Sequence, residues 1–174
     1  MNPTHATTRR EAIAGIGIAL STAITRASAQ QAPMQEPPPN TADRRTSIHQ
    51  EIELKGTPER LYSVLLDSKK FAAFTGLPAE IETSAGGTFK TFGGLIEGRN
   101  VELIADQRIV QAWRPASWPA GIYSLVHFEL KASGTGTTLN LDHTGFPEGD
   151  YDHLLFGWNH RYWEPLKKYL AAAS

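Results

Sequence analysis

His143 is the residue in this sequence best placed to move a proton inside the fold. In the strand-like run from Thr137 to Thr144 (TTLNLDHT), Leu139 and Leu141 share a face with His143, because side chains alternate along a strand. An inward histidine is either a hydrogen-bonded residue at the rim of a sheet, or a polar contact and proton donor for a ligand near neutral pH. The sequence leaves both interpretations open.

Glu97 and Arg99 are the second pair of residues with chemical potential. They share parity with Val101 and Leu103. If that face is the inner one, we expect the two charges to form a partly buried ion pair at the mouth of a cavity, because an unpaired charge there is too costly. The opposite parity fits this run almost as well.

Motifs for other chemistries are missing. The chain has no cysteine, no H-E-x-x-H or other metal-ligand spacing, no G-x-S-x-G elbow, no phosphate-binding loop and no dinucleotide fingerprint after a strand. His153 and His160 fall opposite the apolar stripe of the last predicted helix, and their spacing of seven makes no chelate. We therefore expect no metal and no cofactor, and no motif demands catalysis.

The last third of the chain predicts the element that positions these residues. Residues 150–170 have helical periodicity, and a set of large side chains falls within about 120° on a helical wheel. This stripe consists of Tyr151, Leu154, Leu155, Trp158, Tyr162, Leu166 and Tyr169. Pro165 predicts a kink or a restart of the helix, because it removes one backbone hydrogen bond and crowds a carbonyl.

Shorter elements precede this helix. We predict a strand over residues 47–54, a helix starting at Thr57-Pro58, a second helix from Asp67 or Ser68 to Gly76, and about six strands between residues 79 and 145. Alternation along the strands predicts that His127 and Glu129 face outward. The residues predicted to face inward are Ile109, Gln111, Trp113, Ile122, Val126, Phe128 and Leu130. The fold class is therefore α+β: a curved antiparallel β-sheet closed by one long C-terminal helix, with two short helices after the first strand.

Residues 1–29 have the composition of an export signal. Arg9 and Arg10 precede a mildly apolar stretch, and Ala27-Ser28-Ala29 is a small-residue cleavage site. The apolar stretch of about fourteen residues is too short to span a bilayer core of about 30 Å, so no permanent membrane anchor is expected. The arginine pair resembles a twin-arginine signal; the alternatives are a general secretory signal, or a cytoplasmic protein whose start is misassigned. We expect the export machinery as a partner and a periplasmic or secreted location.

Cleavage after residue 29 leaves 145 of the 174 residues, enough for one domain with a real core. It removes three arginines and one glutamate, so the net charge changes from −1 to −3. That charge provides no basic field for nucleic acid. The Pro-rich residues 30–45 are predicted to be a disordered spacer, and residues 46–174 the domain.

Several blocks in the predicted domain carry a family resemblance. They are Val110 to Arg114 (VQAWR), Leu141 to Pro147 (LDHTGFP), Gly157-Trp158 followed by Trp163 and Leu166, and the helix entry Thr57-Pro58-Glu59 with Leu61-Tyr62. The chain from residue 47 to 172 resembles the START-like (SRPBCC, helix-grip) superfamily, in the branch of homologues of the activator of heat-shock-protein-90 ATPase. The resemblance implies a curved antiparallel sheet around a long C-terminal helix, with an apolar cavity between them.

That cavity favours an exported domain that binds a hydrophobic or amphipathic small molecule. The expected lining is Trp158, Tyr162 and Leu155 from the helix and Trp113, Phe128 and Leu141 from the sheet, with polarity from His143, Glu97 and Arg99. The alternatives are an enzyme of the polyketide cyclase or dehydratase type that uses His143 in the same cavity, and, if the signal is misread, a cytoplasmic co-chaperone-like domain. A protein-interaction domain is a further possibility, which the polar outward strand positions disfavour.

Overall fold

The structure, a computed structural model, describes residues 35–172. The predicted signal at residues 1–29 and the first residues of the predicted spacer, 30–34, lie outside the described residues. Gln35 onward belongs to one compact unit, which is the domain discussed below.

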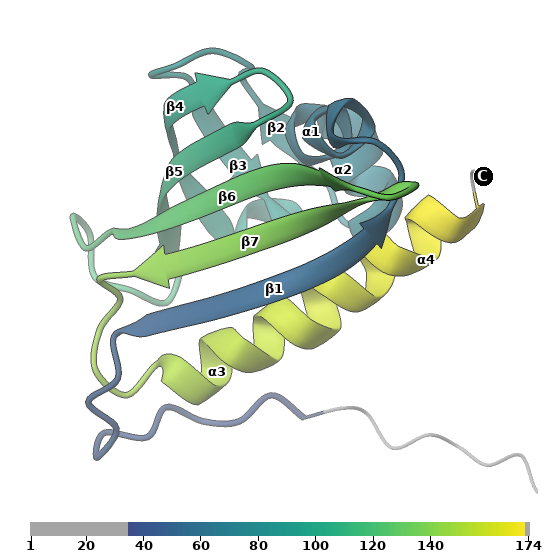
Figure 1. Cartoon of the computed structure of the whole chain (residues 1–174). Coiled ribbons are helices and arrows are strands. Elements are labelled where there is room, and N and C mark those ends of the chain that lie inside the picture. Colours follow the sequence, from purple (N-terminus) through teal and green to yellow (C-terminus); the bar gives the residue numbers. More distant parts are fainter. Residues whose placement is uncertain (1–34, 173–174) are drawn as a thin grey trace, which may run out of the picture. The chain divides into compact units, whose positions relative to one another are not determined.

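Seven strands of the described chain form one curved antiparallel sheet in the order β1-β7-β6-β5-β4-β3-β2 (Figure 1). They are β1 (Ser47–Lys55), β2 (Glu80–Ile81), β3 (Thr88–Thr91), β4 (Ile96–Ile104), β5 (Arg108–Pro115), β6 (Ser124–Ser133) and β7 (Gly136–Thr144). Two short helices, α1 (Pro58–Leu66) and α2 (Ser68–Thr75), follow β1, and a 3-10 turn, η1 (Phe92–Gly94), follows β3. The predicted α+β fold is confirmed, including the place of the two helices and the six strands after them.

Local signals explain where the two short helices begin and end. Thr57 caps α1, and its hydroxyl oxygen accepts a hydrogen bond of 3.3 Å from the backbone N–H of Arg60. Asp67 separates the helices and caps α2 through a 2.8 Å bond from the backbone N–H of Lys70. Gly76 ends α2 with φ 73°, a left-handed conformation that glycine adopts without strain. These caps orient the apolar faces of both helices toward the core.

The C-terminal helix runs without a break along the sheet (Figure 1), but its middle is π-helical. It consists of α3 (Tyr151–Phe156), the π segment η2 (Gly157–Trp163) and α4 (Glu164–Ala172). The backbone N–H of Glu164 donates to the carbonyl of Asn159, five residues back. The predicted disturbance at Pro165 is thus a widened turn just before the proline rather than a sharp kink, because wider turns relieve the crowding between the proline ring and the preceding turn.

The π segment also changes which side chains face the sheet. Trp158 and Tyr162, both in the predicted stripe, are buried, and so is Trp163, which a regular helical wheel leaves outside the stripe. The extra residue in each π turn rotates Trp163 toward β1. Leu166 and Leu170 continue the buried face into α4.

Strand parity is as predicted over most of the sheet. Ile109, Gln111 and Trp113 of β5, and Val126, Phe128 and Leu130 of β6, are all buried. Ile122 is an exception, since 42% of its surface is exposed. It precedes β6 in a turn, where its backbone N–H donates to Pro119, so the alternation of the strand does not extend to it.

Each tryptophan N–H has an acceptor, as an indole buried with its polar atom requires. The pairs are Trp113 with Gln111, Trp118 with Asp150, Trp158 with His143, and Trp163 with Gln50. These bonds tie the aromatic core to β1, β5, β7 and the start of α3, so the large rings are held in specific orientations.

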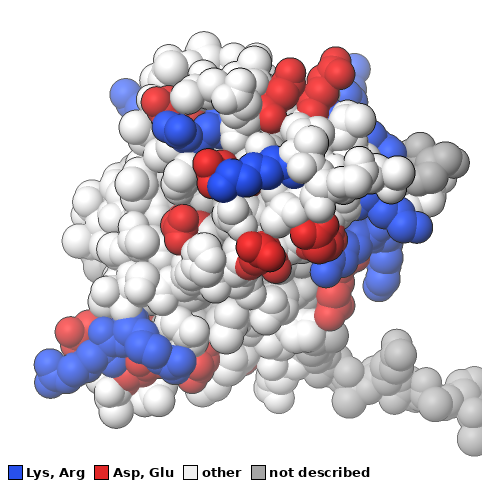
Figure 2. Space-filling view, viewed as in Figure 1, with Lys and Arg blue, Asp and Glu red and all other residues white. Residues whose placement is uncertain are grey.

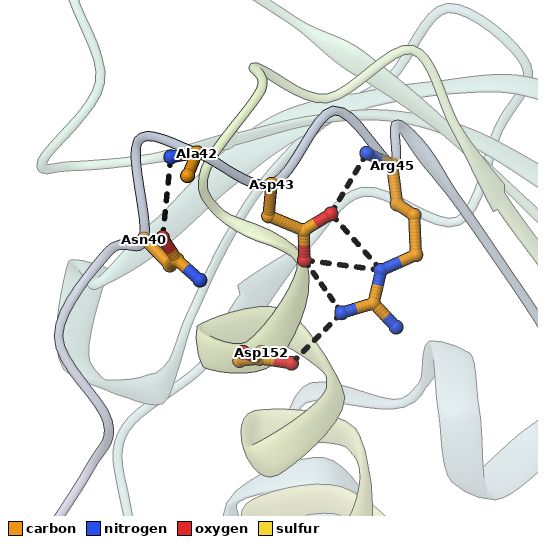
Figure 3. Close-up of polar contacts among 5 residues, drawn as sticks. All are labelled: Asn40, Ala42, Asp43, Arg45 and Asp152. Atoms are coloured by element: carbon orange, nitrogen blue, oxygen red, sulfur yellow. Dashed lines mark hydrogen bonds and ion pairs between the residues drawn. The ribbon is translucent and has the colours of Figure 1, made fainter.

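Residues 35–45, the described part of the predicted spacer, contain no helix or strand but are bonded to the domain; we call them the N-terminal strap. Asn40 donates its backbone N–H to Gly149, and Gly149 donates to Asp43, both at 2.8 Å. Arg45 bonds to Asp43 and reaches Asp152 of α3 at 3.2 Å (Figure 3). The Arg45 guanidinium also lies 3.5 Å from the ring centre of Tyr151. The strap is therefore attached to α3.

Candidate functional site

A cavity of about 240 Å³ lies between the C-terminal helix and the part of the sheet formed by β4 and β5. Most of its wall is apolar, and its charged and imidazole side chains come from the strap and the helix. The lining consists of Phe92, Leu95, Ile96, Trp113, Pro115, Ala116, Leu154, Gly157, Trp158 and Tyr162, with Glu36, Ser117, His153 and Arg161. An apolar wall with a few polar groups is the usual make-up of a small-molecule site.

Three aromatic rings form the inner wall of this cavity. Trp113 of β5 stacks on Trp158 of the helix, with ring centres 4.9 Å apart and planes at 28°. Tyr162 lies 4.9 Å from Trp158 and 6.3 Å from Trp113. Burial raises the pKa of the Tyr162 phenol, which therefore stays protonated at neutral pH. The wall is rigid and uncharged.

The other predicted lining residues lie elsewhere. Phe128, Leu141 and His143 are buried in the packed core behind Trp158, and they do not line the cavity. Leu155 is half-buried and packs against the core without lining it. The cavity lies toward one end of the helix, because the indoles of Trp158 and Trp163 fill the centre.

His143 is inaccessible to solvent and both of its ring nitrogens are engaged. The Trp158 indole N–H donates to Nδ1 at 3.0 Å, and Nε2 lies 2.7 Å from the Ser124 hydroxyl. Since Nδ1 accepts, Nε2 carries the proton and donates it to Ser124, whose own hydroxyl reaches the backbone carbonyl of Trp113 at 3.4 Å. Burial lowers the pKa of His143 to about 3. The ring is therefore a neutral structural link between helix and sheet.

A second buried polar chain runs from Trp113 toward the other edge of the sheet. The Trp113 indole N–H donates to Gln111 at 2.8 Å, Gln111 donates to Asn100 at 2.8 Å, and Asn100 donates to the backbone carbonyl of Glu82 at 2.7 Å. The inward position of Gln111 was predicted from the sequence, and the burial of Asn100 was not. The alternation of apolar residues along β5 predicts that Gln111 is buried. Asn100 lies beside a β-bulge, and no local sequence pattern predicts that bulge.

The hypothesis that Glu97 pairs with Arg99 is wrong. Glu97 bonds to Arg114 of β5, at 2.5 Å and 3.0 Å, and raises the pKa of that guanidinium. Arg99 is exposed. The two residues do come together, but in a separate open groove of about 910 Å³ along β2, β3 and β4. The bulge between Asn100 and Glu102 explains the error, because it changes the parity of β4 partway along the strand.

His153 and Arg161 lie at the mouth of the cavity, where both contact Glu36 of the strap. Arg161 is 2.6 Å and His153 is 3.3 Å from the carboxylate oxygens of Glu36. His153 was predicted to lie opposite the apolar stripe of the helix, and its side chain is 33% exposed. These three side chains come together because the strap lies against the helix, a contact that no local sequence pattern predicts.

Charges on the face seen in Figure 2 do not gather into a patch of one sign. Figure 2 shows lysines and arginines interspersed with aspartates and glutamates over the visible face. Within residues 35–172, no three His, Asp or Glu side chains are grouped so that they could hold a metal ion. No helix of that part of the chain is both long and apolar enough to cross a membrane.

Comparison with known proteins places the chain among helix-grip domains. Residues 55–171 match the family model described as Activator of Hsp90 ATPase homolog 1-like protein. The chain is 32% identical over 111 residues to mouse Activator of 90 kDa heat shock protein ATPase homolog 2, and 31% identical over 121 residues to human homolog 1. These matches cover 64% and 67% of this chain but only 34% and 36% of the relatives, so the chain corresponds to about a third of their length.

A solved structure shows the same fold over nearly its whole length. The crystal structure of an HSP90 activator from Plasmodium falciparum superposes with a TM-score of 0.69 and 25% sequence identity. The superposition covers 73% of this chain and 97% of that one. The curved sheet, the two short helices and the long terminal helix are therefore shared.

Proposed function

Because the chain belongs to the Activator of Hsp90 ATPase homolog 1-like family, we propose that it is a binding domain that holds a small apolar or amphipathic molecule between its sheet and its C-terminal helix. The observation that carries this proposal is the cavity of about 240 Å³ against Trp113, Trp158 and Tyr162. A site of mostly apolar walls with charges only at its mouth suits a molecule with an apolar body and one polar end.

The volume restricts the ligand. An engineered apolar cavity of about 150 Å³ accommodates benzene, and sites for drug-sized ligands begin near about 300 Å³. At about 240 Å³, the cavity has room for one or two fused rings or a short chain. Of the hydrophobic or amphipathic ligands expected from the sequence, small aromatic ones fit this volume best.

Gly157 offers a direct test of the cavity. A Cβ atom at this position meets no atom within 4 Å outside the adjoining helix backbone, and the residue lines the cavity, so Gly157→Leu should fill it while leaving the fold intact. We expect the wild-type chain to bind 2-naphthamide, and Gly157→Leu to weaken that binding by at least about tenfold, or about 1.4 kcal/mol, in calorimetric titrations. Gly157→Ala is the matched control and should retain most of the affinity.

The proposal fails if the wild-type chain binds no apolar probe and native mass spectrometry of the purified protein detects no retained small molecule. It also fails if Gly157→Leu binds 2-naphthamide as well as the wild type does, since the probe then occupies another place.

The cyclase or dehydratase alternative is weakened by the position of its first candidate residue. His143 lies outside the cavity, and burial lowers its pKa to about 3, so it is a poor proton donor or acceptor for a bound substrate at neutral pH. Tyr162 and His153 are the titratable side chains on the helix side of the cavity. An enzyme of this type would depend on them instead.

A chaperone-partner role is the second candidate, because the relatives with the matching domain are named activators of a 90 kDa heat shock protein ATPase. The match spans about a third of their length, so this role is a proposal for the present chain. It predicts that the purified domain changes the ATPase rate of a purified Hsp90. A pure ligand-binding domain leaves that rate unaltered.

We also propose that residues 1–29 direct export, which favours the ligand-binding role over the chaperone role. Expression in a bacterium with both export routes should yield periplasmic protein whose N-terminus is Gln30, as read by terminal sequencing. Replacing Arg9 and Arg10 with lysine should retain the protein in the cytoplasm if the twin-arginine route is used, and have little effect if the general secretory route is used. Cytoplasmic protein that begins at Met1 would contradict the proposal.

A further inference from the structure

The mouth of the cavity is the part of the molecule where unlike charges meet an apolar interior. Arg161 and His153 belong to the same helix, eight residues apart, and both line the cavity. Most of the remaining lining is apolar, including Leu154 and Trp158 from the helix and Pro115 from β5. Two nitrogen donors that flank an apolar hollow form a receptor for a negatively charged end group.

The protein's own carboxylate occupies this receptor. One oxygen of Glu36 lies 2.6 Å from an Arg161 nitrogen and the other lies 3.3 Å from Nε2 of His153. The Glu36 side chain is 26% exposed, against 47% for Arg161. A carboxylate that spreads its two oxygens over two donors reproduces what a carboxylic acid ligand would present there.

Glu36 reaches this place as part of the strap and not as part of the packed core. The strap is fastened further along, by the backbone bonds between Asn40 or Asp43 and Gly149 and by the contacts of Arg45 with Asp152 and Tyr151. Glu36 therefore lies four residues before the first of these attachments. Such a tether keeps the carboxylate at a high effective concentration while allowing it to leave.

We infer that the cavity takes a small apolar carboxylic acid, whose ring or chain contacts Trp113 and Trp158 and whose carboxylate replaces Glu36 on Arg161 and His153. Glu36 is then an internal competitor that closes the empty site. This inference rests on the proposed binding function and adds the chemical class of the ligand and the residues that select it.

Two probes of nearly the same shape separate charge recognition from apolar binding: 2-naphthoate and the uncharged 2-naphthamide. We expect calorimetric titration of the full chain to show about tenfold tighter binding of 2-naphthoate, because a hydrogen bond to a charged group is stronger than one between neutral groups. Arg161→Gln should bring the two affinities to within about twofold. Lys69→Gln, which removes an exposed cation on α2, is the matched control and should preserve the preference.

Removing the internal competitor should have the opposite effect. Glu36→Gln should tighten 2-naphthoate binding about three- to fivefold, the range set by a solvent-accessible ion pair, and should leave the affinity for 2-naphthamide within about twofold. Glu59→Gln on α1 removes an exposed carboxylate outside the cavity and should change neither affinity.

Equal affinity of the wild type for both probes, or an equal loss of both in Arg161→Gln, overturns the carboxylate inference while the binding function stands. Tighter binding of both probes in Glu36→Gln shows that the strap acts only as a steric cover, and also overturns it. Failure of both probes to bind any variant, together with no retained small molecule in native mass spectrometry, rejects the proposed function itself.

Discussion

Lowering the pH from 7 to 4.5 should reduce the free energy of unfolding by about 3 kcal/mol through His143 alone. Burial lowers the pKa of this ring to about 3 in the folded protein, whereas an unfolded histidine has a pKa of about 6.5. Between these values the unfolded chain binds a proton that the folded chain excludes. The contribution of His143 to the free energy of unfolding is therefore fully present above about pH 6.5. Below that pH it falls by about 1.4 kcal/mol per pH unit, until the pKa of the folded state is reached.

The geometry explains why the ring resists protonation. A proton added to Nδ1 meets the N–H of Trp158, which already points at that nitrogen from 3.0 Å. The neighbouring ring centres are those of Phe146 at 5.0 Å and Trp158 at 5.7 Å, and neither aromatic ring carries a charge to stabilise the cation. Charging the ring therefore costs both its desolvation and one of its two hydrogen bonds.

Urea denaturation at a series of pH values checks this expectation. The wild-type slope between pH 6.5 and 5 is the informative part, because most carboxylates titrate below that range. His143→Gln keeps polar atoms near Ser124 and Trp158 but has no titrating group, and should flatten the slope at some cost in stability at pH 7. His49→Gln removes a histidine of β1 whose ring lies 2.7 Å from Asp142, and measures what a histidine outside the core contributes to the slope. A wild-type slope equal to that of His143→Gln would show that the ring is protonated in the folded state.

The orientation of His143 was predictable, and its partners were not. Alternation along β7 places the ring inside because Leu139 and Leu141 share its face. Ser124 lies on β6, nineteen residues away, and Trp158 lies fifteen residues away on the helix. The contacts of these two residues with His143 depend on the register of β6 with β7 and on the path of the helix. Local patterns specify faces, whereas the contacts between faces follow from register and packing.

The same distinction explains the predicted lining of the cavity. Trp113, Phe128 and Leu141 all point inward, as their strand parity requires, but only Trp113 borders the cavity. Whether an inward residue meets a cavity or another side chain depends on the volumes of its neighbours. Here the π segment turns Trp163 inward against Trp158, with ring centres 5.3 Å apart, and the two indoles fill the centre of the domain.

The attachment of the strap to the domain could not be predicted from the sequence, for a different reason. Its Pro-rich, polar composition predicts a segment that cannot bury enough apolar surface to fold by itself. That argument remains sound for the isolated segment. It does not account for attachment to a preformed surface, where Arg45 contacts Tyr151 and Glu36 contacts Arg161. Such contacts join residues more than a hundred positions apart.

Gly98→Ala should destabilise the protein by at least about 3 kcal/mol, because β4 has no room for a Cβ atom at this position. An added Cβ lies 2.0 Å from the backbone carbonyl oxygen of Ala112 on β5 and 2.5 Å from the ring of Phe89 on β3. Both distances are below any real contact of a Cβ, and one of the two atoms is backbone. β4 and β5 must therefore separate, or Phe89 must leave its buried position. That loss is a large fraction of the usual stability of a domain, about 5–15 kcal/mol.

The consequence extends to the proposed site through Phe89. Gly98 pairs with Phe89 on β3 and with Trp113 on β5, its neighbours on either side in the sheet. The ring of Phe89 lies across Gly98, and the ring centres of Phe89 and Trp113 are 6.2 Å apart. Moving Phe89 or β5 shifts Trp113, so Gly98→Ala should lower both the urea midpoint and the near-ultraviolet circular dichroism of the tryptophans. Gly157→Ala makes the same substitution where nothing lies within 4 Å, and should be neutral or stabilise the helix by up to about 1 kcal/mol. Equal stability of the two variants would mean that β4 and β5 are not held as closely as the structure places them, and that Trp113 is not a fixed wall for a ligand.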